Sequence, residues 1–395
     1  MFKITANKIF DGKGNVLENK VLILNSKEEI LAVEDLPSDL GDIQQIDGWI
    51  CPGFVNTHCH LELSHMKGKV DTGTGLIPFI SSVVGHRDID PEMIQAGILA
   101  ADNEMYDSGI VAVGDISNKT DTAITKSKSN LSYYTFVEMF DFMQPQLAEK
   151  TYRQYLDVYQ NFEENHKDQK SVVPHAPYSV SDPLYTYIHQ TNKSKKTISI
   201  HSEETMDELL LFLEKKGGFL DFYEGFGMSL DDFKPTGKSS IYHALDRLDP
   251  AHRTIFVHNT LTTEQGIKAA QTWSDQVYWA TCANANLYIE NRLPDYRAFI
   301  SQKAKMTLGT DSLTSNWQLS IWEEIKTIRT YCSYIPLETL ITWATINGAE
   351  ALGFDHRLGS IEVGKTPGLV AIEGAKELDG MYHLGDSTSR RIIIK

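Results

Sequence analysis

The sequence predicts an α/β fold, a (β/α)8 TIM barrel accompanied by a small β-sandwich domain built from both chain ends. Eight short apolar runs recur along the middle of the 395-residue chain, and helix-like amphipathic stretches separate them. This pattern is typical of β-α units that build a parallel sheet. Turn-rich, β-like segments flank the region on both sides. Eight units within roughly 260 residues match the size of one barrel.

The amino-terminal fifty residues alternate short β-like runs with turn residues. The runs cover residues 2–4, 21–24 and 30–33, and the turn signal Asp-Gly-Lys-Gly occupies residues 11–14. This alternation is typical of a small antiparallel sheet. We therefore assign residues 1–50 to the small β domain.

The barrel strands are expected where the eight apolar runs occur. These runs cover residues 50–58, 110–116, 131–140, 172–175, 197–201, 254–258, 277–282 and 306–311. All eight are of ordinary strand length. We assign residues 51–356 to the barrel.

The carboxy-terminal part of the chain returns to β-like patterns. A helix-like segment at residues 337–352 comes first. Strand-like runs then cover residues 358–365, 369–372 and 391–394. We expect residues 357–395 to pair with residues 1–50 and complete the small domain.

Composition restricts the classes of partner. The chain has 53 acidic and 37 basic residues, and its formal net charge is −16. A negative surface repels phosphate backbones and anionic lipids, so we expect neither nucleic acid nor a membrane as a partner. We expect no signal peptide and no membrane span, and the four cysteines form no CxxC pair or disulfide framework. A cytoplasmic protein that acts on a small molecule is the prediction.

A histidine pair ends the first apolar run. Residues 58–60 read His-Cys-His. Alternate side chains of a strand share one face, so the imidazoles of His58 and His60 should converge on one point, with Cys59 on the other face. Such a pair indicates a metal site. The alternative is two histidines that are merely packed or exposed.

Further polar residues stand at the ends of other predicted strands. They are His175, His201, His258 and Asp311. The carboxyl ends of barrel strands hold the catalytic groups of such enzymes. Three nitrogens and one oxygen could bind a divalent ion and still leave a position for water, as a catalytic site requires. The ligands would be His58, His60, His201 and Asp311.

Glu204 follows His201 by three residues. If the strand turns into a helix there, the Glu204 carboxylate lies beside the metal, where water needs a proton acceptor. The alternative is that Glu203 and Glu204 are early-helix acids favoured by the helix dipole. The position next to a metal ligand favours a chemical role for Glu204.

Several motifs resemble those of the amidohydrolase superfamily, and the resemblance covers nearly the whole chain. They are PGFVNTHCH at residues 52–60, PHAPY at 174–178, HSEE at 201–204, VH at 257–258, GTDS at 309–312 and GSIEVGK at 359–365. The sequence is similar to the branch of amino-heterocycle deaminases and triazine chlorohydrolases, which keep one metal and carry HxxE after strand five. Binuclear relatives carry a carboxylated lysine where this chain has Pro174-His175. The resemblance therefore implies one metal ion.

The resemblance also implies roles for the site residues. The ligands of one Zn²⁺ or Fe²⁺ ion would be His58, His60, His201 and Asp311, and the ion would lower the pKa of bound water. Asp311 and His258 would take the proton from this water. Glu204 would protonate the ring nitrogen beside the carbon that carries the amine. His175 would contact the heterocycle. The alternatives are a core histidine for His258 and a structural hydrogen-bonding histidine for His175.

Shorter stretches are similar to the aminodeoxyfutalosine deaminases, which act on the adenine of a nucleoside. They are HLELS at residues 60–64, GTGLIPFI at 73–80 and NANLYI at 284–289. This similarity implies that Glu62 contacts the heterocycle and that Glu138 meets a ribose hydroxyl or a cationic group. For both, the alternative is a surface or salt-bridged acid. Arg87 could bind a carboxylate, with a solvated helix residue as the alternative.

An aromatic cluster follows the fifth apolar run. Phe222, Tyr223 and Phe226 lie among four glycines there. They could form a lid over the substrate, and the alternative is a core cluster.

The sequence thus predicts a metal-dependent hydrolytic deaminase that releases ammonia from an amino-heterocycle, such as the adenine of aminodeoxyfutalosine. One alternative is an amidase, cyclic amidohydrolase or chlorohydrolase of the same superfamily, and Glu204 favours deamination over these. A second alternative is an inactive scaffold with this fold, which the intact metal-ligand set disfavours. A homodimer is expected from the family alone.

Overall fold

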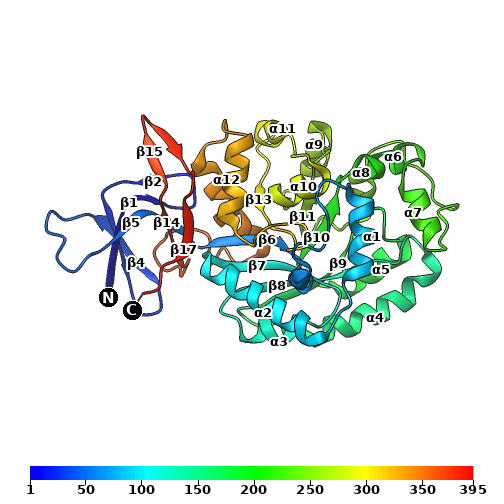
Figure 1. The fold of residues 1–395 in the computed structure, drawn as a ribbon, viewed down its shortest axis with the longest axis horizontal. Helices are drawn as coiled ribbons and strands as arrows, with labels where there is room; N and C mark the ends of the chain where they lie inside the picture. The colour runs from blue at the N-terminus through cyan, green and yellow to red at the C-terminus, as the bar shows by residue number, and fades with distance from the viewer. Residues whose placement is uncertain (395) are drawn as a thin grey trace.

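The computed structural model describes residues 1–394. In Figure 1 a small sheet lies at the left and a larger body of strands and helices lies at the right. The small sheet carries both the dark blue start and the red end of the chain. Both chain ends therefore contribute strands to one sheet.

Eight strands form the centre of the larger body. They are β6 (Phe54–Cys59), β7 (Ile110–Ser117), β8 (Ser132–Met139), β9 (Gln169–Pro174), β10 (Thr197–Ser202), β11 (Arg253–His258), β12 (Val277–Thr281) and β13 (Met306–Leu308). Seven of the predicted runs coincide with one strand each. The prediction for residues 50–58 is wrong, because this run divides at Gly53. Residues up to Pro52 belong to β5 (Gln44–Pro52) of the small sheet, and β6 begins at Phe54.

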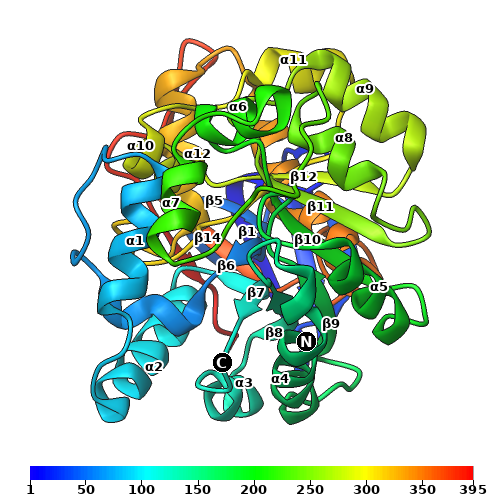
Figure 2. The same cartoon turned by 90° about the vertical axis from the view of Figure 1, so that its right-hand side faces the viewer.

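The eight strands form two parallel four-stranded sheets in chain order, β6-β7-β8-β9 and β10-β11-β12-β13. Contacts join the sheets at both edges. The backbone N–H of His201 donates to the carbonyl of His175 over 2.9 Å, and Cys59 forms a parallel bridge with Asp311. Figure 2 shows these strands in the middle with helices around them.

Helices follow most of the central strands. The α-helices are α1 (Leu76–His86), α2 (Pro91–Asp107), α3 (Ala123–Lys128), α4 (Ala148–Asn161), α5 (Asp182–Thr191), α6 (Met206–Glu214), α7 (Phe219–Gly225), α8 (Ser240–Leu245), α9 (Glu264–Trp273), α10 (Ala283–Glu290), α11 (Tyr296–Ser301), α12 (Ile321–Tyr331), α13 (Leu337–Thr342) and α14 (Gly348–Leu352). Two 3-10 helices, η1 (Leu61–Met66) and η2 (Pro145–Leu147), and the π-helical segment η3 (Trp343–Asn347) complete the set. The predicted helix at 337–352 is therefore one helical segment with a π-turn in the middle.

Local sequence explains where two of these helices begin. The Asp90 carboxylate accepts the N–H of Glu92 at 2.8 Å, and Pro91 occupies the first position of α2. Proline is tolerated there because that N–H has no partner within the helix. The Ser320 hydroxyl accepts the N–H of Glu323 at the start of α12. These caps satisfy N–H groups that the first turn leaves free.

Burial distinguishes the central strands from those of the small sheet. Every residue of β6, β7 and β8 is buried. Parallel strands that are covered on both faces have this pattern, and their sequences read as continuous apolar runs rather than alternating ones. His60 just after β6 and Glu138 near the end of β8 line a cavity, so these strand ends belong to the candidate site.

The small sheet has seven strands in the order β17-β14-β5-β1-β3-β4, with β2 paired to β1. Its further strands are β1 (Phe2–Phe10), β2 (Val16–Leu17), β3 (Lys20–Leu24), β4 (Ile30–Asp35), β14 (Leu369–Glu373) and β17 (Thr388–Arg391), and a separate pair consists of β15 (Lys376–Leu378) and β16 (Met381–His383). The predicted antiparallel pairing is correct for β1-β3 and β3-β4, whereas β1 and β5 are parallel. A sandwich arrangement of this domain stays a prediction.

Two predicted carboxy-terminal strands differ from the structure. Residues 358–365 form no strand, because Gly359 and Gly364 adopt φ values of 87° and 89° that interrupt an extended backbone. Gly364 still donates its N–H to the carbonyl of Ile30. The last strand, β17, covers Thr388–Arg391. The strand predicted at residues 391–394 therefore lies too close to the chain end.

The four cysteines are free thiols. Among residues 1–394, no helix combines the length and the apolar character that crossing a lipid bilayer requires.

Substitution of Gly53 should destabilise the junction between the two sheets. In Gly53→Ala the new methyl group would lie 2.2 Å from Val111 Cγ1 and 2.7 Å from the carbonyl oxygen of Pro367. We expect the free energy of unfolding to fall by about 1–3 kcal/mol, as for other overpacked sites, in urea denaturation. Gly85→Ala is the control, because its methyl would meet no atom within 4 Å. That change should be neutral or stabilise α1 by up to about 1 kcal/mol, and equal losses in both variants would contradict the prediction.

Candidate active site

The predicted site residues meet at the carboxyl ends of the central strands. His58 lies on β6 with His60 just beyond it, His201 lies on β10, His258 ends β11, and Asp311 follows β13. The side chains of His58, His201, His258 and Asp311 are buried, and that of His60 is mostly buried. Parallel strands end at the same edge, so five residues that are far apart in the chain come together.

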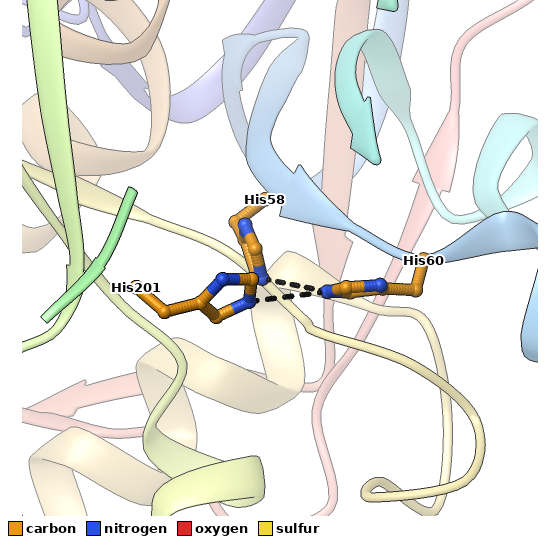
Figure 3. Close-up of side chains that lie close together, drawn as sticks. All are labelled: His58, His60 and His201. Atoms are coloured by element: carbon orange, nitrogen blue, oxygen red, sulfur yellow. Dashed lines mark hydrogen bonds between the residues drawn. The ribbon is translucent and has the colours of Figure 1, made fainter. Parts of the chain in front are cut away.

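Three imidazole rings point toward one another in Figure 3. The Nε2 atom of His60 lies 3.2 Å from that of His58 and 3.3 Å from that of His201. Asp311 Oδ1 lies 3.4 Å from His60 Nε2 and 3.6 Å from His58 Nε2. The alternation predicted for residues 58–60 is therefore correct, and His60 Nε2 lies within 3.4 Å of one side-chain atom each of His58, His201 and Asp311.

The protonation of these rings suits a metal ion. Burial lowers the pKa of His58, lowers that of His60 to about 3, and lowers that of His201 well below its usual value. The Nδ1–H of His201 donates to the His175 carbonyl at 2.9 Å, which leaves a lone pair on Nε2. Buried lone pairs this close repel one another unless a cation lies between them. The donor set thus fits a divalent ion such as Zn²⁺.

Asp311 supplies negative charge to this cluster. Burial alone would raise its pKa, but its contacts with His58 and His60 hold the pKa below the usual range. The Ser315 hydroxyl donates to Oδ2 at 2.6 Å, so Oδ1 is the oxygen that faces the imidazoles. The carboxylate is therefore ionised and oriented.

Glu204 lies in the loop after β10 and points into the site. Its Oε1 accepts the Tyr178 hydroxyl at 3.0 Å, and its Oε2 lies 3.5 Å from His258 Nε2. Burial raises the pKa of Glu204 to about 8, so the group carries a proton at neutral pH. Glu204 precedes α6, which begins at Met206, and it is therefore not an exposed acid of the first helical turn. Glu203 is also buried, and burial raises its pKa too.

His258 is oriented by an amide. Its Nδ1–H donates to the Asn286 side-chain oxygen at 2.8 Å, so the lone pair on Nε2 faces Glu204. Burial lowers the pKa of His258, which keeps the ring neutral. His258, Asp311 and Glu203 adopt positive φ values of 72°, 57° and 51°. Non-glycine residues in this region are uncommon and cluster at functional sites.

Glu138 and His175 form a second side of the site. Glu138 Oε1 lies 3.3 Å from His201 Nδ1 and has no hydrogen-bond partner, while Oε2 accepts the Asn118 side-chain amide at 3.2 Å. Burial raises the pKa of Glu138 to about 8. His175 Nδ1 contacts the Ser179 hydroxyl at 2.7 Å, and its ring lines the cavity. Both residues therefore line the cavity, and their contact with substrate stays a prediction.

Glu62 lies outside the cavity lining. Its Oε1 accepts the Arg87 guanidinium at 2.8 Å, and its Oε2 accepts the backbone N–H groups of Asn118 and Lys119 at 2.9 and 3.1 Å. Glu62 is therefore a salt-bridged acid, which was the alternative to a residue that contacts the heterocycle. Contact between Glu62 and the substrate stays a prediction. Arg87, at the end of α1, does line the cavity.

The cavity beside the imidazoles has a volume of about 200 Å³. Apolar side chains of α1 and α7 form its outer part, namely Leu76, Phe79, Ile80, Val83 and Phe222, joined by Phe226 just after α7. All three aromatic residues of the cluster line the cavity, and the buried Tyr223 also donates its hydroxyl to the Tyr178 carbonyl at 2.6 Å. Opening of this cluster as a lid stays a prediction.

The sequence profile of the Amidohydrolase family matches residues 49–391. This chain belongs to the amidohydrolase family. The family resemblance inferred from the motifs is confirmed.

Two relatives of this amidohydrolase show how far the similarity extends. The aminodeoxyfutalosine deaminase of Nitratiruptor sp. is 25% identical over 390 residues, which cover 96% of this chain and 92% of the relative. The 5'-deoxyadenosine deaminase of Methanococcus maripaludis is 26% identical over 393 residues, which cover 90% and 85%.

Solved structures share the fold. The Helicobacter pylori aminofutalosine deaminase in complex with methylthio-coformycin has a TM-score of 0.81 at 24% identity, with 96% of this chain and 94% of that chain covered. A Xanthomonas campestris adenosine deaminase with bound zinc has a TM-score of 0.71 at 23% identity, with 94% and 84% covered.

Three residues of the amidohydrolase site escaped the sequence analysis as individual contributors. Tyr178 lies within the PHAPY motif and Asn286 within the NANLYI stretch, so both were visible in motifs without a stated role. Ser315 has no signal in the sequence, because a serine four residues after an aspartate is ordinary. All three act by contacting predicted residues across the fold.

Glu204→Gln should change how stability depends on pH. Below about pH 4.5 the Glu204 carboxyl is protonated in both the folded and the unfolded chain. Between about pH 4.5 and 8 only the unfolded chain releases this proton. The free energy of unfolding therefore falls as the pH rises through this range. The glutamine variant lacks this loss. In urea denaturation of chelator-treated protein it should gain about 1 kcal/mol or more relative to the parent from pH 5 to pH 8.

The control for this measurement is Glu214→Gln at the exposed end of α6, where Lys216 lowers the glutamate pKa by a hydrogen bond. This variant should show no such gain. Parallel pH curves for the Glu204→Gln variant and the parent would contradict a raised pKa at Glu204.

Proposed function

We propose that this amidohydrolase is a metal-dependent hydrolytic deaminase that releases ammonia from the adenine-like base of a nucleoside. The observation that carries the proposal is the buried Glu204 carboxyl, 3.5 Å from His258 Nε2, beside the imidazoles of His58, His60 and His201. The names of the relatives support it, since adenosine, 5'-deoxyadenosine and aminodeoxyfutalosine deaminases are among them.

The proposed metal ligands are His58, His60, His201 and Asp311, whose atoms converge as described. One divalent ion, Zn²⁺ or Fe²⁺, would activate water for attack at neutral pH. Imidazole and carboxylate ligands suit both metals. A single ion is supported by Pro174-His175 at the end of β9, where no lysine is available to bridge two ions.

Three side chains of the protein would move protons. Asp311 and the neutral His258 accept the proton of the attacking water, and their buried positions exclude other water molecules. Glu204 donates its proton to the ring nitrogen beside the attacked carbon, which keeps negative charge from building on the ring. Asp311 and His258 then pass the proton taken from water to the amine, the carbon–nitrogen bond breaks and ammonia leaves. The remaining hydroxyl proton returns to Glu204 as the ring carbonyl forms.

The cavity residues would bind the rest of the substrate. His175 and Glu138 face the cavity and can contact the heterocycle and a ribose hydroxyl, while Glu62 holds Arg87 at the cavity wall. The apolar residues of α1 and α7 suit an uncharged, apolar group on the sugar. 5'-Deoxyadenosine, named for one relative, is therefore one candidate substrate to test, and aminodeoxyfutalosine, named for another, is a second.

The proposed setting of this site is a closed (β/α)8 barrel over residues 51–356. A small domain of residues 1–50 and 357–395 would flank the barrel. The edge contacts at His201 and Asp311 support closure.

We further propose a cytoplasmic enzyme that uses no nucleic acid or membrane partner and assembles as a homodimer. Its four free cysteines are compatible with a reducing compartment.

Ammonia release tests the proposed reaction. Protein loaded with zinc or iron is supplied with adenosine, 5'-deoxyadenosine, aminodeoxyfutalosine, free adenine, guanine, cytosine and an aminotriazine. We expect ammonia from at least one adenine nucleoside and none after chelation. Stoichiometric metal without ammonia release would favour amide or halide hydrolysis, and absence of bound metal would favour an inactive scaffold.

Glu204→Gln tests the proposed acid. Loss of the transferable proton should lower kcat by about 10²- to 10⁴-fold, the range for a general acid, while metal content measured by mass spectrometry stays at the parent value. The matched control is Glu214→Gln at the exposed end of α6, which should keep full activity. Full activity of the Glu204→Gln variant would remove this residue from the reaction.

A further inference from the structure

Glu208 lies beneath the loop that carries Glu204. Its side chain is fully buried at the third position of α6. Oε1 accepts the backbone N–H of Glu203 at 3.1 Å, and Oε2 accepts the N–H of Glu204 at 2.8 Å. One carboxylate therefore binds two consecutive N–H groups of the loop, one of which belongs to the residue proposed as the acid.

These two hydrogen bonds differ from the helix cap that the local sequence predicts. Thr205 and Glu208 form a T-x-x-E pattern, which ordinarily makes a capping box between the threonine and the helix. Thr205 makes no side-chain capping bond here, and Glu208 reaches beyond it to the two preceding residues. The carboxylate thus serves the loop in place of the helix terminus.

The loop has an unfavourable shape that needs support. Glu203 adopts a positive φ of 51°, which is uncommon for a side chain of its size. Successive N–H groups in such a conformation form a concave nest, and the two oxygens of the Glu208 carboxyl group accept both of these N–H groups. On the other side, the Thr260 hydroxyl donates to the carbonyls of Glu203 and Glu204 at 3.1 and 2.5 Å. Both faces of the loop backbone are therefore held.

Stability alone does not explain a carboxylate at this place. Over the described part of the chain, residues 1–394, no lysine, arginine or histidine forms a salt bridge with Glu208. A buried acid without a cation is costly to fold around. The group also lies outside the cavity lining, so it does not meet substrate directly.

We propose that Glu208 is a positioning residue for deamination, which holds the Glu203 and Glu204 N–H groups so that the Glu204 carboxyl stays between Tyr178 and His258. This inference rests on the proposed function. In this proposal Glu208, four residues after Glu204, orients the Glu204 carboxyl through the backbone of the loop.

Glu208→Gln tests the role, because the amide group turns a donor toward one of the two N–H groups. We expect kcat per bound metal to fall about 10- to 100-fold, as for small displacements of catalytic groups, with KM changed less than about threefold. Metal content should stay at the parent value. Glu214→Gln on the same helix is the control and should match the parent. A lower melting temperature with unchanged kcat per metal would overturn the proposal and leave a structural role.

A double-mutant cycle separates positioning from an independent effect. If Glu208 acts only through Glu204, adding Glu208→Gln to Glu204→Gln should change the residual kcat by less than about twofold. A further loss equal to that of the single variant would overturn the proposal.

Amide hydrogen exchange gives a readout that needs no activity. In the metal-loaded protein, the backbone amides of residues 202–206 should exchange faster in Glu208→Gln than in the parent. Their exchange rate in Glu214→Gln should equal that of the parent. Unchanged exchange in Glu208→Gln would overturn the proposed contact. If the parent releases no ammonia from any substrate, the proposed function fails and the role in deamination falls with it, while exchange still decides whether Glu208 holds the loop.

Discussion

The convergence of three buried imidazoles is the constraint on which the rest of this structure depends. His60 Nε2 lies within 3.3 Å of the corresponding atoms of His58 and His201, although the two strands that carry the rings are about 140 residues apart in the chain. Strand ends must be held to within a fraction of an ångström for such an arrangement. Fully buried strands such as β6 provide that rigidity, because close-packed interiors resist small displacements.

Burial shifts the pKa values of both the histidines and Glu204. Burial disfavours charge, so it lowers the pKa of the histidines and raises that of Glu204 to about 8. Neutral imidazoles are the form that binds a metal, and a protonated carboxyl is the form that donates a proton. Asp311 is the exception, since its contacts with the histidines keep it ionised. The site therefore combines the negative Asp311 carboxylate and the neutral Glu204 carboxyl group within one buried cluster.

The strand pattern was the most predictable part of the fold, because buried parallel strands leave continuous apolar runs in the sequence. The errors occurred where glycine changed the backbone direction. Gly53 separates β5 from β6, since a Cβ there would meet Val111 and the Pro367 carbonyl. Gly359 and Gly364 interrupt the run at 358–365 in the same way. Apolar character alone does not reveal such breaks, because they depend on segments distant in the chain.

The sequence by itself determined which residues are candidate metal ligands and which carboxyl group is the candidate acid. His58, His60, His201 and Asp311 stand at strand ends, and strand periodicity and parallel order are properties of local sequence. Only the tertiary structure decided which atoms of each residue face the site. It paired Glu62 with Arg87, turned Glu138 toward the cavity, and brought Tyr178 to Glu204. The physical reason is that hydrogen bonds between distant segments choose among orientations that local sequence leaves equally available.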